Sequence, residues 1–420
     1  MDLQLSDSRP APSGADDEEL QTTEDKSPGP GLSSMLDSDA DPMVKLGKRE
    51  SGGESESETE QDMFQSLQEP SSVSTHRKNS FSRSQPKTKG DLHIHTVLEC
   101  GCEAMSCKFN EDGTLLAVGL SNGSIKVYKT DTGEQLNTLK DHETIVSSLP
   151  VTSLYFTHTS RTDNVLLATY ASGCVKCWYV SGRECVWQLA EKSTTKIGEE
   201  EVMQRQTLCL SVSRSGDQAV TGGSDSTVHL YDIHTQREKQ ICRPSMLRTI
   251  MDGHSSRVFA VMFHPLTETQ FISGGWDNTV QFWDTRQQHA VRMLYGPHVC
   301  GEALHIDPLT NQVLSGSWRK ENTLEVWDYI SCKKVTSIPA DPEGDSRMYT
   351  CQWLGGDHII AAGSKANTLR VIDRHSFKVK SRLYDLPYAV FSSSACRSGK
   401  GEWLIAATSG DRVFLLIMGQ

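Results

Sequence analysis

Residues 273–286 read SGGWDNTVQFWDTR, which is the end of one strand, a tight turn and a second strand that closes on Trp283. Six other strands of this kind end in an aromatic or aliphatic residue, at Tyr128, Trp178, Tyr231, Trp327, Ile372 and Leu416. Successive ends are 44 to 53 residues apart. A repeat of this length, built from short strands and turns, is typical of four-stranded blades arranged radially.

Each of these strands follows a turn rich in Gly, Ser or Asn, an apolar strand such as QFISGG, and a further strand before that. Seven such units in residues 91–420 predict an all-β domain of seven blades. The seventh unit stops at Gln420 after its third strand, whereas the alternating run LHIHTVLEC stands alone before the first unit. We therefore expect residues 91–100 to complete the seventh blade and close the ring.

The composition of residues 1–90 differs from that of the repeats. Residues 1–70 hold 18 acidic and 5 basic residues, and residues 71–90 hold 5 basic and no acidic residues. The segment lacks the apolar periodicity that could offset the entropy of ordering it, so we expect a disordered tail over residues 1–90. Nearby acidic or basic residues make four serines candidate phosphorylation sites, and a tail that only solvates the protein is the alternative. These serines are Ser51, Ser55, Ser57 and Ser80.

The repeats resemble the WD-repeat family of β-propellers over about residues 91–420. The motif is clearest in the fourth unit, where Gly253-His254 precedes Trp283-Asp284 by the usual interval of that family. Other third strands end in YD, WD or ID, and the first, second and seventh units lack the Asp. The expected fold class is therefore an all-β, seven-bladed WD-repeat β-propeller preceded by a disordered N-terminal tail.

The resemblance also implies a structural hydrogen-bonded set inside the fourth blade, formed by His254, Ser273, Asp277 and Trp283. A half-buried indole N–H and a buried carboxylate need partners, which these residues would provide for one another. The same His/Ser/Asp trio could indicate a hydrolase. Because Ser273 lies in mid-strand at a repeated position without a nucleophile elbow, the structural interpretation is favoured over catalysis.

The sequence contains no Gly-rich phosphate loop, cofactor fingerprint or metal-ligand cluster, so we expect no enzyme, cofactor, metal or small-molecule substrate. Its twelve cysteines are scattered. The pairs Cys100/Cys102 and Cys174/Cys177 have no second pair at zinc-finger spacing, which favours buried structural thiols.

No apolar run approaches a membrane span and no leader is evident, so a cytoplasmic or nuclear protein without a membrane partner is expected. The net charge of −12 and slightly acidic repeats argue against nucleic acid as a partner.

Function is therefore expected on the surfaces of the propeller, as a non-catalytic scaffold or adaptor for other proteins. Aligning units four to six gathers aromatic and basic residues around the top of the central channel. An acidic or phosphorylated peptide suits such a patch, and packing around the channel is the alternative for any single residue. The predicted top-face residues are Arg257, Phe259, Trp276, Trp318, Arg319, Lys320, Arg347, Tyr349 and Lys365.

Arg286 follows the third strand of the fourth unit and is expected on the opposite, bottom face. Residues 272–286 are similar to the box found in WD-repeat substrate receptors of cullin-4 ubiquitin ligases, in which the arginine contacts the ligase adaptor. Such receptors often carry two of these arginines, but the fifth unit reads WDYIS and has none. A general scaffold is the first expectation, and a cullin-4 ligase receptor is the alternative.

Overall fold

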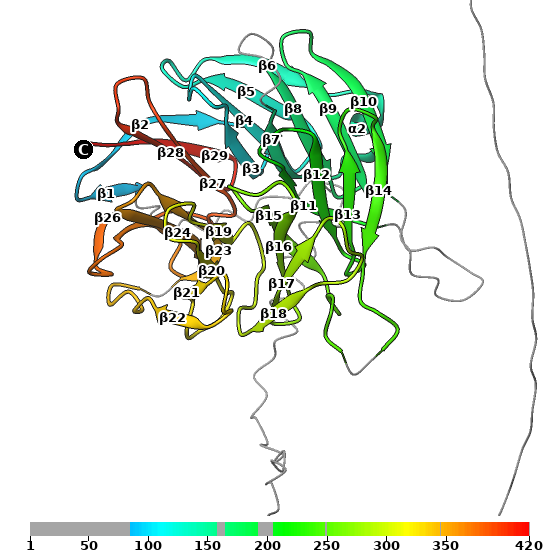
Figure 1. Ribbon diagram of the computed structural model, residues 1–420. Coiled ribbons are helices and arrows are strands. Elements are labelled where there is room, and N and C mark those ends of the chain that lie inside the picture. Colours follow the sequence, from blue (N-terminus) through cyan, green and yellow to red (C-terminus); the bar gives the residue numbers. More distant parts are fainter. Residues whose placement is uncertain (1–84, 158–163, 192–204, 248–249, 345, 420) are drawn as a thin grey trace, which may run out of the picture. The chain divides into compact units, whose positions relative to one another are not determined.

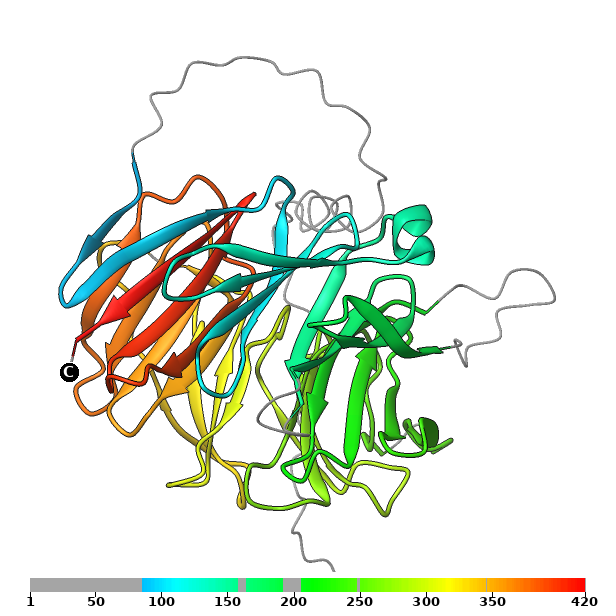
Figure 2. The same ribbon diagram turned by 90° about the horizontal axis from the view of Figure 1, so that it is seen from above.

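The computed structural model describes residues 85–157, 164–191, 205–247, 250–344 and 346–419 (Figure 1). The predicted tail as far as residue 84, with Ser51, Ser55, Ser57 and Ser80, lies outside these residues. Within the described part, the strands form seven antiparallel sheets, which are arranged as blades around a central axis (Figures 1 and 2). A cavity of about 150 Å³ is lined by residues from the first strands of all seven blades. The fold class predicted from the repeats is confirmed.

The first three blades each consist of four consecutive strands, and a short helix, α2 (His142–Ser147), precedes the second blade. Blade 1 contains β3 (Ala104–Phe109), β4 (Leu115–Leu120), β5 (Ile125–Lys129) and β6 (Gln135–Leu139). Blade 2 contains β7 (Val151–Phe156), β8 (Val165–Tyr170), β9 (Cys174–Tyr179) and β10 (Glu184–Ala190). Blade 3 contains β11 (Thr207–Val212), β12 (Gln218–Gly223), β13 (Val228–Asp232) and β14 (Arg237–Cys242).

Blades 4 and 5 repeat this order, whereas blades 6 and 7 each include a strand from the N-terminal part of the described chain. Blade 4 contains β15 (Val258–Phe263), β16 (Gln270–Gly275), β17 (Thr279–Asp284) and β18 (Arg292–Tyr295). Blade 5 contains β19 (Leu304–Ile306), β20 (Gln312–Gly316), β21 (Leu324–Asp328) and β22 (Lys334–Ser337). Blade 6 contains β23 (Arg347–Leu354), β24 (His358–Ser364), β25 (Leu369–Asp373), β26 (Val379–Tyr384) and β1 (Lys87–Lys89). Blade 7 contains β27 (Ser393–Arg397), β28 (Trp403–Ser409), β29 (Arg412–Met418) and β2 (Leu92–Glu99).

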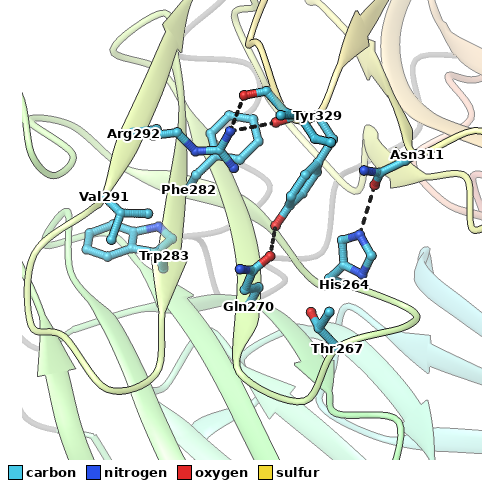
Figure 3. Close-up of a pocket in the computed structure, with 10 residues that line it drawn as sticks. His264, Thr267, Gln270, Phe282, Trp283, Val291, Arg292, Asn311 and Tyr329 are labelled. Carbon is cyan, nitrogen blue, oxygen red and sulfur yellow. Dashed lines mark hydrogen bonds between the residues drawn. The ribbon is translucent and has the colours of Figure 1, made fainter.

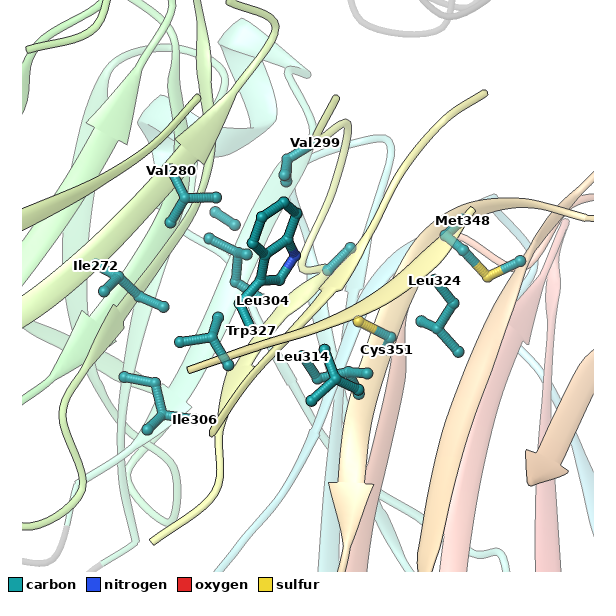
Figure 4. Packing of buried hydrophobic residues seen from close by; sticks show 14 of the residues in the cluster. Ile272, Val280, Val299, Leu304, Ile306, Leu314, Leu324, Trp327, Met348 and Cys351 are labelled. Atoms are coloured by element: carbon teal, nitrogen blue, oxygen red, sulfur yellow. The ribbon is translucent and has the colours of Figure 1, made fainter. Parts of the chain in front are cut away.

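The middle strands are buried on both faces because each blade packs between two neighbours. Every residue of β17 is buried, whereas the outer strand β10 alternates between exposed and half-buried residues. Figure 4 shows one such interface, in which Trp327 of blade 5 lies among Ile272 and Val280 of blade 4 and Met348 of blade 6 belongs to the same cluster. Burial of apolar surface between blades is therefore the main source of stability.

The ring closes through β2. This strand pairs antiparallel with β29 over its whole length, from Leu92 opposite Met418 to Glu99 opposite Arg412. Leu92 packs with the core shared by blades 6 and 7, and Leu98 packs with the core shared by blades 7 and 1. A strand near the start of the described chain is thereby paired with its last strand in one sheet.

The tail was predicted to extend to residue 90, and the structure corrects this boundary. Strand β1 pairs with β26 as a fifth strand of blade 6, with Lys87 opposite Tyr384 and Lys89 opposite Arg382. Its lysines form ion pairs of 3.2 Å with Asp385 and 3.0 Å with Glu343. Residues 87–89 are mostly charged and show no apolar alternation, so no local pattern predicts a strand here. The strand is instead defined by its backbone pairing with β26 and by these two ion pairs.

Two adjacent residues of β2 provide a matched test of the closure. Leu98 is 3% exposed and Val97 is 38% exposed. We expect Leu98→Ala to lower the free energy of unfolding by about 2–5 kcal/mol, because it leaves a cavity between blades 7 and 1. Val97→Ala should change it by less than about 1 kcal/mol. Urea denaturation of the full chain measures both, and equal losses would contradict the packing of β2.

Candidate functional site

The structure brings His254, Ser273, Asp277 and Trp283 into one hydrogen-bonded chain. The imidazole of His254 lies 2.8 Å from the Asp277 carboxylate through Nδ1 and 2.7 Å from the Ser273 hydroxyl through Nε2. The indole N–H of Trp283 donates to the same hydroxyl at 2.7 Å. Since the carboxylate only accepts, Nδ1 carries the proton and Nε2 accepts from Ser273. The chain links the loop before β15 to β16, β17 and the turn between them.

The Asp277 carboxylate is held in its ionised form. Burial opposes its charge, but hydrogen bonds from His254, Ser255 and Thr279 keep its pKa below the usual value. The next residue, Asn278, has a φ of 62°, a left-handed conformation that asparagine tolerates better than most residues. The turn therefore fixes the carboxylate under the loop that carries His254.

The order Asp277, His254, Ser273 has the connectivity of a hydrolase triad, but its surroundings differ. The side chains of His254 and Asp277 are 0% and 4% exposed, and Ser273 is 0% exposed. The Ser273 oxygen already accepts the indole N–H of Trp283. A nucleophile must reach its substrate, and these side chains are buried and already hydrogen-bonded. This hydrogen-bonded set therefore has a structural role, as an internal brace that links the strands and loops of blade 4.

Blade 3 has a different buried network that sequence reasoning missed. Arg205 takes the place of the loop histidine and pairs with Glu191 at 2.8 Å and with Asp225. Burial opposes the charge of Glu191, but Arg205 and His229 lower its pKa to about 2. Glu191 and Arg205 lie on either side of residues 192–204, outside the aligned strands, so no repeated spacing could reveal the pair. The hydroxyls of Thr207, Thr221 and Tyr231 also donate to Glu191.

The top face, where the first strand of each blade begins, carries the predicted aromatic and basic residues. On blade 4, the Arg257 guanidinium lies 5.7 Å from the centre of the Trp276 ring. The indole N–H of Trp276 donates to Cys300 Sγ at 2.8 Å, and its ring stacks on His298 with centroids 6.2 Å apart. Trp276 is therefore held in a fixed orientation.

Blades 5 and 6 repeat this pairing of arginine and indole. Arg347 at the start of β23 lies 4.4 Å from the centre of the Trp318 ring. Arg319 donates to Asn278 Oδ1 of blade 4 at 2.6 Å, which ties the two blades together. Lys320 and Lys365 are exposed beside them. Five cationic side chains and two indoles are thus distributed over three adjacent blades.

Two of the predicted top-face residues are buried. Phe259 is 5% exposed and Tyr349 is 6% exposed. The ring of Phe259 packs against Trp276 at 5.2 Å, and that of Tyr349 packs against Trp318 at 6.4 Å. Both residues lie at an irregularity in the register of the first strand, between Val258 and Ala260 in β15 and between Met348 and Thr350 in β23. Their rings pack against the indoles and do not form the outer surface.

The bottom face carries Arg286 and a groove between blades 4 and 5. The Arg286 side chain is 73% exposed and forms an ion pair with Asp284, whose pKa it holds below the usual value. The groove has a volume of about 460 Å³ (Figure 3). In this groove His264 pairs with Asn311, and Tyr329 donates to Gln270. Arg292 donates to the carbonyls of Tyr329 and Ile330.

The cysteine pairs singled out in the sequence lie between β2 and β3 and within β9. All twelve cysteines are free thiols. Burial raises the pKa of Cys100 to about 11 and that of Cys177 to about 12. In the part of the chain that the structure describes, no group of three or more His, Cys, Asp or Glu is placed to hold a metal ion. No helix of that part is long and apolar enough to cross a membrane.

Truncation of Trp283 tests the brace of blade 4. Trp283→Ala removes a side chain that is 1% exposed and leaves the Ser273 hydroxyl without its donor. We expect a loss of about 3–5 kcal/mol in the free energy of unfolding. Arg286→Ala, three residues away on the surface, should cost less than about 1 kcal/mol. A Trp283→Ala variant with unchanged thermal stability would contradict the structural role.

Comparisons with known proteins agree with this architecture. A family model described as the NUP159/214 beta propeller matches residues 73–273. The WD repeat-containing protein slp1 of Schizosaccharomyces pombe is 25% identical over 268 residues, which cover 62% of this chain and 48% of slp1. A DDB1- and CUL4-associated factor 11 homolog of Caenorhabditis elegans is 26% identical over 188 residues, which cover 41% of this chain and 31% of that protein.

Both of these matches span less than half of the relative's own length. A chain in a crystal structure of the mitotic checkpoint complex superposes with a TM-score of 0.62 at 17% identity, covering 82% of this chain and 99% of that one. This likeness concerns the fold alone. With seven blades in register, the chain has the fold of a seven-bladed β-propeller and is similar to WD-repeat proteins.

Proposed function

We propose that this protein is a non-catalytic interaction scaffold that binds acidic or phosphorylated segments of other proteins on the top face of blades 4 to 6. The observation that carries the proposal is the repeated pairing of guanidinium and indole, Arg257 with Trp276 and Arg347 with Trp318. Arginine recognises carboxylate and phosphate groups through two parallel hydrogen bonds. Indoles supply the apolar contact that interface centres favour.

The charge of these loops supports an anionic ligand. Asp341 and Glu343, which lie before β23, are paired with Arg382 at 3.3 Å and 2.7 Å. Glu321 is exposed next to Lys320 and offsets part of the positive charge. Among the described residues, the patch holds five cations, and Arg382 engages two of the three acids named here, although the whole chain has a net charge of −12. A local positive surface on an acidic protein steers anionic partners toward that surface.

The relatives support a role in binding proteins. The relative in C. elegans is named for its association with two other proteins. We propose the same kind of role, association with other proteins, for this chain.

Binding of a doubly phosphorylated acidic peptide to the full chain tests the proposal, with fluorescence anisotropy as the measurement. We expect Arg347→Ala to weaken binding about tenfold or more, because a charge-assisted hydrogen bond contributes about 1.5–3 kcal/mol. Arg397→Ala is the matched control, since Arg397 lies 4.4 Å from the Trp403 ring centre, as Arg347 does from Trp318, but at the bottom end of blade 7. Equal effects of the two variants would argue against a top-face site. Trp276 is less suitable for this test because its hydrogen bond to Cys300 gives it a structural role.

Arg286 supports a second candidate function, that of a substrate receptor of a cullin-4 ubiquitin ligase. Its guanidinium is exposed on the bottom face and oriented by Asp284. The match to a DDB1- and CUL4-associated factor homolog favours the same idea. Affinity purification of the full chain should then recover a cullin-4 adaptor, and Arg286→Ala should lose it while keeping top-face partners. Recovery of no adaptor by the unaltered chain would leave the general scaffold.

A further inference from the structure

The N-terminal tail joins the propeller at the top of blade 6. Strand β26 ends at Tyr384, after which the chain crosses the top face to β27. Because β1 is antiparallel to β26 and Lys87 is opposite Tyr384, the chain enters β1 at this top end. The ion pair between Lys87 and Asp385 fixes the entry point. The tail is therefore tethered on the face, and on the blade, that carries Arg347 and Lys365.

The tail contains a segment whose charge is complementary to this face. Residues 51–62 read SGGESESETEQD, with five acidic and no basic residues. The patch presents cations from three blades, Arg257, Arg319, Lys320, Arg347 and Lys365. Phosphorylation of Ser51, Ser55 or Ser57 would add about 1.5–2 negative charges at each site.

The tether is long enough for the distance to be spanned. Blade 6 has five strands, so the first strand lies about 20 Å from β1 at a spacing of roughly 4.8 Å per strand. The 22 residues between the acidic segment and residue 85 could reach up to about 75 Å, which is more than this distance. A linker that can span its two sites gives an effective concentration on the order of 1 mM.

We propose that residues 51–62 are an intramolecular ligand of the top face of blades 4 to 6 and compete there with the acidic segments of partners. This inference rests on the proposed function of that face. A tethered ligand occupies the site and so weakens the apparent affinity for a free competitor. The factor is 1 + C/Kd, where C is the effective concentration of the tethered segment and Kd is the dissociation constant of that segment. For a segment with a dissociation constant of about 100 μM, the expected weakening is roughly tenfold.

The test compares full-length chains that differ only in the tail. The probe is a fluorescent synthetic peptide with the sequence of residues 49–64, titrated in trans. We expect the chain with Glu54→Gln, Glu56→Gln, Glu58→Gln and Glu60→Gln to bind this probe about tenfold more tightly than the unaltered chain. The control chain carries Asp16→Asn, Asp17→Asn, Glu18→Gln and Glu19→Gln, which removes four charges farther from the tether and should leave the affinity within about twofold.

The outcomes separate this inference from the function on which it rests. If both tail variants bind the probe more tightly by the same factor, the general charge of the tail and not residues 51–62 is responsible, and the inference is wrong. If the probe binds the unaltered and the neutralised chains equally, the tail does not occupy the face, while the proposed function survives. If the neutralised chain binds no probe but still binds the doubly phosphorylated acidic peptide, this inference is wrong and the proposed function survives; if it binds neither peptide, both proposals fail. Addition of Arg347→Ala to the neutralised chain should weaken its affinity for the probe about tenfold, which would place the competition on the top face.

Discussion

The antiparallel pairing of β2 with β29 is the interaction on which the rest of the structure depends. Seven blades can bury both faces of every middle strand only if the last blade also meets the first, and the third strand of blade 7 lies at the end of the chain. Strand β2 supplies the missing outer strand and places Leu92 and Leu98 in two inter-blade cores. The closure also decides where the tail leaves the ring, because β1 precedes β2 by only a short turn and lies on the neighbouring blade.

The blades share apolar packing but differ in how their top loops are fixed. In blade 4, His254 links the Ser273 hydroxyl to one carboxylate, whereas in blade 3 Arg205 lies between two carboxylates. A buried ion pair costs desolvation energy, so its net value depends on the hydrogen bonds that satisfy the remaining groups. Glu191 meets this condition with donors from Thr207, Thr221 and Tyr231. Degenerate WD motifs are therefore tolerated where another polar network occupies the same place.

The sequence predicts the blades well because each contains the same periodic signals, and it predicts less where contacts join distant segments. The seven third strands and the Gly- and Asn-marked turns identify the repeats directly. Strand β1 has no local signature, since partners such as Asp385 and Glu343, far away in the sequence, hold its lysines. The repeats place Phe259 and Tyr349 on first strands, but the irregular register at both positions, which accompanies their burial, has no signal in the sequence. Pairing and burial of this kind are tertiary effects that a repeat alignment does not contain.

The burial of these two rings makes the top face a better recognition surface. Stacking of an arginine on an indole does not define a site, because Arg397 and Trp403 form the same contact at the bottom of blade 7. On the top face, Phe259 and Tyr349 support the indoles from below, and Arg319 reaches across to Asn278. Side chains that are already ordered lose less conformational entropy when a ligand binds. If the top face binds an anionic segment, as we propose, the aromatic side chains packed against the indoles would lower the entropic cost of that binding.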